Sequence, residues 1–205
     1  MLVTATALAL GFLHGLGADH LMAIAALSMD GDLGDRSAAA RRARALSVAV
    51  RFAAGHALLL GLGAGIIVLI GWSIPPHVER GGEMLGGALL IVMGLVTLQH
   101  LARHSHPIHA HSHLPTMIGA AFAVSSLRAL AMLTPFGADL GTAPLPVLLA
   151  LIVTFAVGIL LSMSLFGVAL AGVLSTRALA RVGQGAGALV GLSSVVLGVA
   201  WVVTA

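Results

Sequence analysis

The sequence predicts an all-α polytopic membrane protein with six transmembrane helices, and two observations lead to that fold class. The chain is 59% hydrophobic and 8% charged, with a mean hydropathy of +1.09, and a soluble domain of this composition would expose large apolar areas to water. Its apolar residues also form continuous runs that can cross about 30 Å of hydrocarbon, unlike the short alternating segments of a membrane β-barrel. We therefore expect a single transmembrane domain, residues 1–205, in the lipid bilayer.

The expected spans cover residues of about 2–29, 45–70, 81–101, 116–133, 145–174 and 185–204. A short sequence repeat hints at how they are arranged. Phe52-Ala53-Ala54-Gly55 in the second span recurs as Phe155-Ala156-Val157-Gly158 in the fifth, 155 − 52 = 103 residues later. With three spans in each half, the halves would have opposite orientations, so two inverted three-helix repeats are one arrangement that the sequence suggests.

The loops between these spans predict the orientation of the chain. Odd-numbered loops carry Arg36, Arg41, Arg42, Arg44, Arg103, Arg177 and Arg181, whereas even-numbered loops carry Arg80 alone. Because cytoplasmic loops are enriched in Lys and Arg, we expect a multi-pass protein of the cytoplasmic membrane with both termini outside.

Composition also limits the partners and ligands. The ten basic residues are all arginines, set against seven acidic residues and dispersed along the chain, so no nucleic acid partner is expected. The chain has no cysteine, which excludes thiolate metal sites and leaves histidine, carboxylate and methionine as ligands. The sequence points to no protein partner.

The first span contains three ionisable residues, His14, Asp19 and His20. Such residues are costly inside a membrane and usually mark a transport path or a ligand site. On a straight helix His14 and Asp19 would lie about 140° and about 7.5 Å apart, so the three groups can meet only if the helix is distorted. Gly15 and Gly17 permit that distortion at low steric cost. The alternative is that both histidines pack between helices, with Asp19 as a hydrogen-bond partner.

A further nitrogen ligand from a second helix is expected at His56, deep in the second span. Imidazole nitrogens with a carboxylate suit nickel, cobalt, zinc and copper. Arg51, nearer the cytoplasmic end, is expected to extend toward the lipid headgroups. In the fourth span Arg128 is a candidate partner for Asp19 or Asp139, and in the fifth Ser162 and Met163 are candidates for lining a path.

The third loop, about residues 100–115, is rich in histidine and is a candidate auxiliary metal-binding segment. The alternative is a flexible polar connector, since Pro107 and Pro115 disfavour a regular helix through it. Its histidines are His100, His104, His106, His109, His111 and His113.

Two segments resemble the nickel/cobalt transporter family, the NiCoT and NicO-type permeases. His14-Gly15-Leu16-Gly17-Ala18-Asp19-His20 is similar to the His-x4-Asp-His signature of that family, and Phe52-Ala53-Ala54-Gly55-His56-Ala57 is similar to its Phe-x-x-Gly-His-Ser/Ala element. The resemblance covers about the first quarter of the chain. It implies that His14, Asp19 and His20 select the metal with His56 nearby, and that Ni²⁺ or Co²⁺ is the transported substrate of a secondary carrier.

This chain also departs from the family pattern. Larger members have eight spans with the signature on the second, whereas the motif here is on the first. Residues 158–167 lie where the family's later acidic signature would be sought, and they contain no carboxylate. Uptake and efflux both remain open at this point.

Two other classes of function compete with a carrier. A haem-binding membrane protein would use His14 or His20 together with His56 as axial ligands. An intramembrane metalloenzyme is disfavoured because the sequence has neither His-Glu-x-x-His nor Gly-x-Ser-x-Gly. We therefore expect no enzyme activity and no cofactor.

Overall fold

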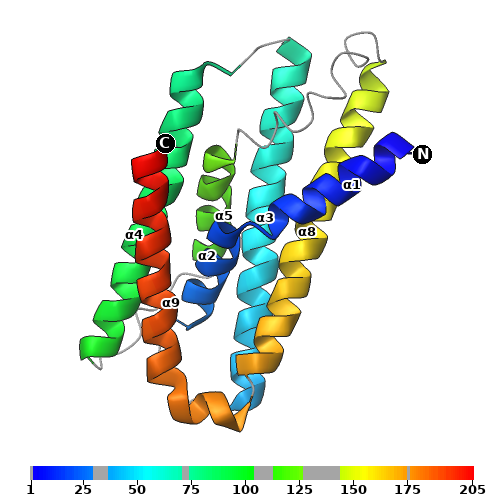
Figure 1. The fold of residues 1–205 in the computed structure, drawn as a ribbon. Coiled ribbons are helices and arrows are strands. Elements are labelled where there is room, and N and C mark those ends of the chain that lie inside the picture. The colour runs from blue at the N-terminus through cyan, green and yellow to red at the C-terminus, as the bar shows by residue number, and fades with distance from the viewer. Residues whose placement is uncertain (1, 30–36, 71–73, 104–112, 127–143, 175) are drawn as a thin grey trace.

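A computed structural model describes residues 2–29, 37–70, 74–103, 113–126, 144–174 and 176–205. Within these ranges the secondary structure is helical and contains no strand, which confirms the predicted all-α class (Figure 1). The helices are α1 (Leu2–Gly15), α2 (Ala18–Met29), α3 (Ala38–Ile70), α4 (Pro76–Arg103), α5 (Leu114–Ser125), α8 (Leu145–Leu174) and α9 (Arg177–Thr204).

Four of these helices, α3, α4, α8 and α9, are long and apolar enough to cross a membrane. The pair α1 and α2 adds a fifth span if it is counted as one helix bent by 52°. These helices are compatible with a multi-pass membrane protein. The expected six spans are not confirmed, because α5 has only 12 residues and residues 127–143, which include the rest of the expected fourth span, lie outside the described part.

Helix α3 begins seven residues before the predicted start at residue 45, at Ala38. The hydroxyl of Ser37 accepts the backbone N–H of Ala40 at 3.2 Å and so caps the helix. Three of the arginines expected in the first loop, Arg41, Arg42 and Arg44, are therefore in the first turns of α3, and Arg36 lies outside the described residues. Arg41 Nε donates to the carbonyl of Leu174 at 2.8 Å, and Arg44 donates to the carbonyl of Leu27 at 3.2 Å. These bonds satisfy backbone acceptors at the C-terminal ends of α8 and α2.

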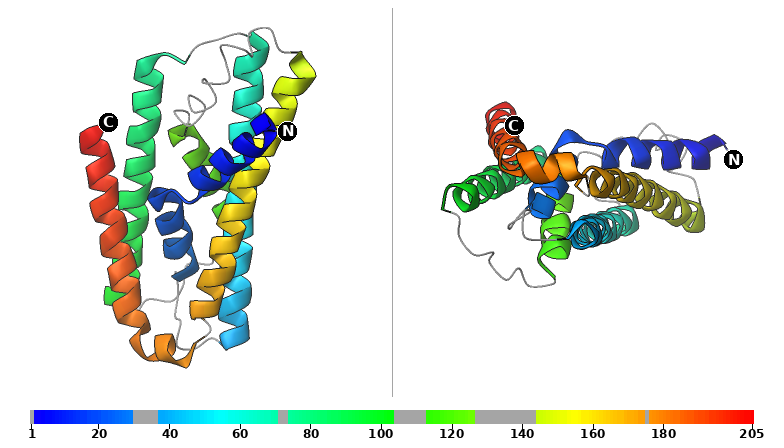
Figure 2. Two further views of the ribbon diagram at one scale, coloured as in Figure 1. Left: turned by 45° about the vertical axis from the view of Figure 1, so that its right-hand side comes forward. Right: turned by 90° about the horizontal axis from the view of Figure 1, so that it is seen from below.

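Helix α2 lies among the longer helices of the bundle. Helix α3 packs against α8 and α5, α4 packs against α9, and α1 crosses α8 obliquely (Figures 1 and 2). Helix α2 contacts α3, α4, α8 and α9, so the segment that carries Asp19 and His20 lies inside the bundle.

Two helix crossings are built in the same way from glycine. Where α3 meets α5, a Cβ on Gly55 would collide with the carbonyl of Thr116, and a Cβ on Gly119 would collide with the carbonyl of Phe52. Where α8 meets α1, a Cβ on Gly158 would collide with the carbonyl of Leu8, and one on Gly11 with that of Phe155. The backbones therefore touch at both crossings, as small residues allow in membrane helices.

Helices α4 and α9 also approach through glycines. A Cβ on Gly87 would lie 2.8 Å from the carbonyl oxygen of Gly198, and one on Gly94 would lie 2.5 Å from that of Gly191. Because residue numbers rise along one helix as they fall along the other, the two helices run antiparallel.

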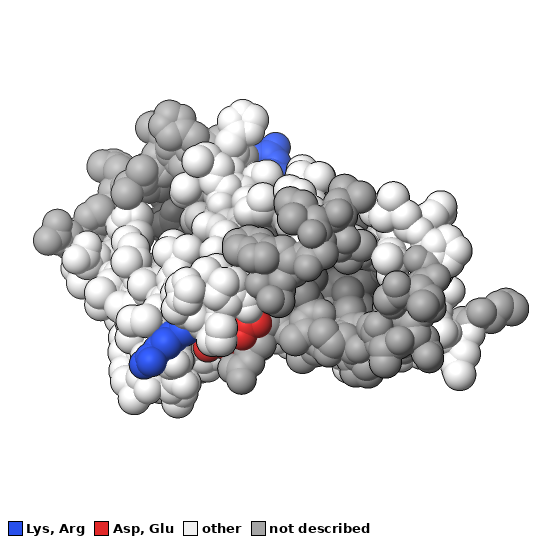
Figure 3. Space-filling view, turned by 90° about the horizontal axis from the view of Figure 1, so that it is seen from above, with Lys and Arg blue, Asp and Glu red and all other residues white. Residues whose placement is uncertain are grey.

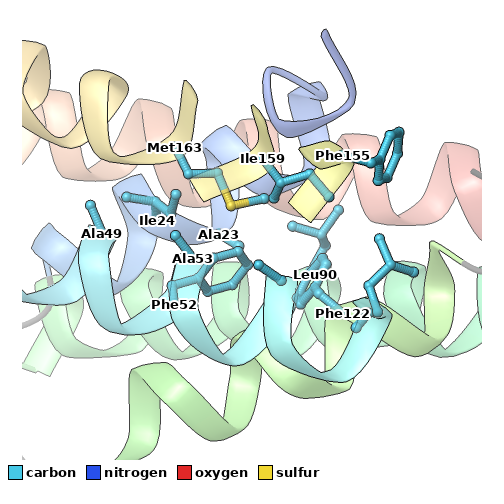
Figure 4. Packing of buried hydrophobic residues seen from close by; sticks show 13 residues of the cluster. Ala23, Ile24, Ala49, Phe52, Ala53, Leu90, Phe122, Phe155, Ile159 and Met163 are labelled. Atoms are coloured by element: carbon cyan, nitrogen blue, oxygen red, sulfur yellow. The ribbon is translucent and has the colours of Figure 1, made fainter. Parts of the chain in front are cut away.

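The main apolar core lies where α2, α3, α5 and α8 meet (Figure 4). Ile24 of α2, Phe52 of α3, Phe122 of α5 and Ile159 of α8 are almost fully buried there. The cluster comprises Ala23, Ile24, Ala49, Phe52, Ala53, Ala57, Leu60, Leu90, Phe122, Ala123, Phe155, Ile159 and Met163.

The outside of the bundle is apolar along its helices. On α9 the exposed large side chains recur every three or four residues, as on a helix face turned toward lipid. They are Leu189, Leu192, Val196, Val199 and Val203. Seen from above, acidic atoms lie beside one group of basic atoms, and a second basic group lies apart from them on the same face (Figure 3).

The close crossing of α3 and α5 predicts that Gly119→Ala destabilises the protein. The added methyl group would meet backbone atoms of Phe52 that cannot rotate away, and such overpacking typically costs about 1–3 kcal/mol. The thermal unfolding midpoint in detergent should therefore fall.

Gly63→Ala is the matched control, because nothing lies within 4 Å of a Cβ there and alanine favours a helix by up to about 1 kcal/mol over glycine. Its midpoint should stay the same or rise. Equal midpoints for the two variants would contradict the close crossing.

Candidate metal centre

The first predicted span is broken at its glycines. Helix α1 ends at Gly15, α2 begins at Ala18, and their axes differ by 52°. The N–H of Gly17 donates to the carbonyl of His14 at 2.9 Å, which closes a turn at the break. The distortion predicted from the positions of His14 and Asp19 is confirmed.

Both glycines at the break face other groups closely. A Cβ on Gly17 would lie 2.6 Å from Asp19 Oδ1 and 2.8 Å from His20 Nδ1, and a Cβ on Gly15 would collide with the hydroxyl of Ser162. Glycine at position 17 therefore avoids a clash with the Asp19 and His20 side chains.

The break brings together three histidines from three helices. One ring nitrogen from each of His14 (α1), His20 (α2) and His56 (α3) lies within 4.8 Å of the others. The His20 ring centroid is 4.6 Å from that of His56 and 5.0 Å from that of His14, and His14 and His56 are 5.6 Å apart. The predicted approach of His56 to the histidines of the first span is confirmed.

Asp19 lies beside this group, in the first turn of α2. Its Oδ1 is 3.2 Å from His20 Nδ1, although Nδ1 makes no hydrogen bond of acceptable geometry. The group of three histidines with close ring nitrogens does not include Asp19. The Asp19 carboxylate therefore lies next to this group, beside His20. The positive end of the α2 dipole favours a negative charge at this position.

Two of the histidines have a hydrogen-bond partner on α5 or at its C-cap residue, Ser126. His56 Nδ1 lies 3.2 Å from the carbonyl oxygen of Gly119, which can only accept, so Nδ1 carries the hydrogen. His20 Nε2 lies 3.3 Å from Ser126 Oγ. Helix α5 therefore orients two imidazoles that belong to other helices.

Each ring also has a buried nitrogen with no hydrogen-bond partner among the residues that the structure describes. One buried carboxylate oxygen of Asp19 also has no such partner. An unsatisfied buried polar atom costs about 1–3 kcal/mol, and four such atoms in one place call for a ligand. These atoms are His14 Nε2, His20 Nδ1, His56 Nε2 and Asp19 Oδ2.

Aromatic rings enclose the centre. Phe155 stacks on His14 with centroids 5.9 Å apart, Phe52 stacks on His56 at 6.2 Å, and Phe122 lies 6.3 Å from His20. The exposed fractions of His20 and His56 are 2% and 0%. A polar donor set is therefore held in an apolar shell, where its atoms interact strongly with a cation.

The donor set suits a transition-metal ion. Unprotonated imidazole nitrogens are common ligands for zinc, nickel, cobalt and copper, whereas magnesium and calcium prefer oxygen. A tetrahedral ion with nitrogens at about 2.0–2.1 Å would hold them about 3.4 Å apart. The ring nitrogens lie within 4.8 Å of one another, a range that includes this spacing.

The other predicted site residues do not join this centre. His100, on α4, is partly buried and His113, just before α5, is exposed, and neither is in the three-histidine group. His104, His106, His109 and His111 lie outside the described residues, as do Arg128 and Asp139.

The fifth-span residues have separate positions. Ser162 is fully buried beside Gly15 and donates to the carbonyl of Ile159 at 3.0 Å. Met163 is part of the apolar core.

Several residues of the site were not predicted from the sequence. Phe52 is four residues before His56, so the helix period already places the two on one face. Gly119 and Ser126 come from a distant helix and have no local signal in the sequence.

The chain matches no family model, no curated protein and no solved structure. The comparisons therefore do not bear on the role of the histidine centre.

The convergence of α1 and α3 predicts cross-linking between positions 14 and 56. The chain has no cysteine, so the double variant His14→Cys and His56→Cys carries only the two new thiols. A short methanethiosulfonate cross-linker should join them within one chain, which mass spectrometry of the digest would detect.

In the control, His14→Cys is combined with Leu58→Cys, because Leu58 is 65% exposed on the outside of α3. Cross-linking of the control alone, or of both variants equally, would contradict the arrangement.

Proposed function

We propose that this protein is a secondary carrier of divalent transition-metal ions, most specifically Ni²⁺ or Co²⁺, across the cytoplasmic membrane. The observation that carries the proposal is the group of three buried imidazoles at a broken helix, each with a nitrogen that has no hydrogen-bond partner among the described residues. Broken membrane helices are where carriers expose polar groups to an ion. The resemblance of the His-x4-Asp-His segment to the nickel/cobalt transporter family adds nickel and cobalt as the expected ions.

The glycine crossings support an inverted repeat as part of this proposal. The two crossings correspond if α3 is matched with α8 and α1 with α5. Gly55 of α3 then corresponds to Gly158 of α8 (158 − 55 = 103), and Gly11 of α1 corresponds to Gly119 of α5 (119 − 11 = 108). Phe52 and Phe155 give 103 again. The repeat seen in the sequence therefore coincides with two crossings that use the same backbone contacts.

The α4–α9 pair obeys the same relation. An offset of 104 residues takes Gly87 to Gly191 (191 − 87 = 104) and Gly94 to Gly198 (198 − 94 = 104), so the pair Gly87–Gly198 exchanges with the pair Gly191–Gly94. Such exchange is expected for a two-fold axis between antiparallel helices. We propose two inverted halves of three spans each, with both termini outside.

The metal centre belongs to one half. By these offsets the position of His14 corresponds to Phe122 (14 + 108) and that of His56 to Ile159 (56 + 103). The counterparts are apolar, and Phe122 packs against His20. In this proposal one half supplies the ligands and the other supplies the wall around them, which gives one ion site for each chain.

A bis-histidine haem has less support. A macrocycle between His14 and His56 would have to occupy the space in which the His20 ring lies, 5.0 and 4.6 Å from their centroids. Three converging imidazoles instead suit a single metal ion.

The function predicts loss of metal flux when a ligand is removed. In proteoliposomes with Co²⁺ or Ni²⁺ outside, His20→Ala and His56→Ala should each reduce metal entry by at least the roughly 10- to 100-fold typical of losing a second-shell group. A trapped metal-sensitive dye would measure the rate with the pH gradient set in either direction.

The control is His77→Ala, because His77 is exposed at the start of α4, away from the centre. All variants should be compared at equal folded amounts by gel filtration and circular dichroism. Transport by His20→Ala or His56→Ala at the parent rate would overturn the proposed function.

A further inference from the structure

Helix α5 contributes no ligand to the histidine centre, yet it supplies the hydrogen-bond partners of two of its rings. We propose that Ser126 is a positioning residue that holds His20 with its hydrogen on Nε2, so that Nδ1 is the nitrogen offered to the metal ion. This inference rests on the proposed function and specifies the donor atoms of the same site.

In the proposed arrangement the hydroxyl of Ser126 acts as an acceptor toward His20. Its single hydrogen is donated to the carbonyl of Phe122 at 3.1 Å. With that hydrogen given to Phe122, the contact of 3.3 Å between Ser126 Oγ and His20 Nε2 is made by a hydrogen on Nε2. A neutral imidazole has one such hydrogen, so Nδ1 of His20 is left with a lone pair.

The surroundings of His20 Nδ1 agree with this tautomer. Nδ1 has no hydrogen-bond partner among the described residues, and the nearby Asp19 Oδ1, 3.2 Å away, is itself an electron-pair donor. Both atoms lie close to residue 17, where a Cβ would be 2.6 Å from Asp19 Oδ1 and 2.8 Å from His20 Nδ1, so glycine avoids a clash with them. A lone pair and a carboxylate oxygen that face the same space form a site for a cation.

A hydrogen bond also fixes the tautomer of His56, but there the hydrogen is on Nδ1 and not on Nε2. Its Nδ1 hydrogen goes to the carbonyl of Gly119, which leaves Nε2 unpaired. The proposed donor set is therefore Nε2 of His14, Nδ1 of His20 and Nε2 of His56. Second-shell hydrogen bonds of this kind normally fix the tautomer and the ring orientation of metal-binding histidines.

Ser125 offers a matched control on the same helix. It is buried like Ser126, and its hydroxyl also donates to the carbonyl of Phe122, at 2.7 Å. The structure gives it no contact with a histidine ring. Ser125→Ala and Ser126→Ala therefore remove similar hydroxyls, and only the second removes the partner of His20.

The tautomer is measured directly by long-range ¹H–¹⁵N spectra of the metal-free protein labelled with ¹⁵N-histidine, with His20 assigned by its loss in His20→Asn. The parent, Ser125→Ala and Ser126→Thr should show hydrogen on Nε2 of His20. Ser126→Ala should lose that preference. Hydrogen on Nδ1 of the parent, or an unchanged spectrum of Ser126→Ala, would overturn the inference.

Metal affinity is the second readout. With Co²⁺ as the probe, Ser126→Ala should bind about 10- to 100-fold more weakly than the parent, while Ser126→Thr, which keeps the hydroxyl, should restore binding. Parent affinity in Ser126→Ala would contradict the role of Ser126. Absence of Co²⁺ binding by the parent would instead contradict the proposed function, and the tautomer spectra would still decide the role of Ser126.

Discussion

A histidine buried in an apolar bundle needs a partner for each ring nitrogen, and this constraint governs the centre of the molecule. The N–H of a neutral imidazole must find an acceptor, and its other nitrogen must find a donor or a cation. The carbonyl of Gly119 on α5 is an acceptor for His56, and Ser126 at the C-cap of α5 is a hydrogen-bond partner for His20. One ring nitrogen from each of His14, His20 and His56 lies within 4.8 Å of the others, so we propose that a single metal ion satisfies the three rings together.

The backbone is arranged so that this can happen. A straight first span would point His14 and Asp19 in different directions, and the turn at Gly15–Gly17 removes that separation. Helix α5 can reach His56 because Gly119 lets its backbone touch α3. Glycine therefore has two functions here, to break one helix and to let another approach closely.

Much of the fold and part of the site could be predicted from the sequence. The apolar runs predict the long helices because hydrocarbon demands continuous apolar length, and α8 has the predicted bounds, residues 145–174. The break followed from helix geometry applied to His14 and Asp19. The second-span ligand His56 followed from its depth in an apolar run.

Other features depend on contacts between distant parts of the chain and could not be read locally. The start of α3 at Ala38 depends on a cap and on arginine contacts with α8 and α2. Ser126 is an ordinary serine until packing places it beside His20. The placement of Asp19 beside the ligand group, rather than within it, depends on side-chain orientation at the break.

X-ray absorption at the cobalt edge tests the central claim most directly. In the protein used for this measurement, Asn replaces five histidines of the third loop: His104, His106, His109, His111 and His113. This variant is loaded with one equivalent of Co²⁺. The account predicts imidazole scattering from three histidines at about 2.0–2.1 Å, which His14→Ala, His20→Ala and His56→Ala each reduce. A spectrum of an ion bound only by oxygen, unchanged in these variants, would contradict it.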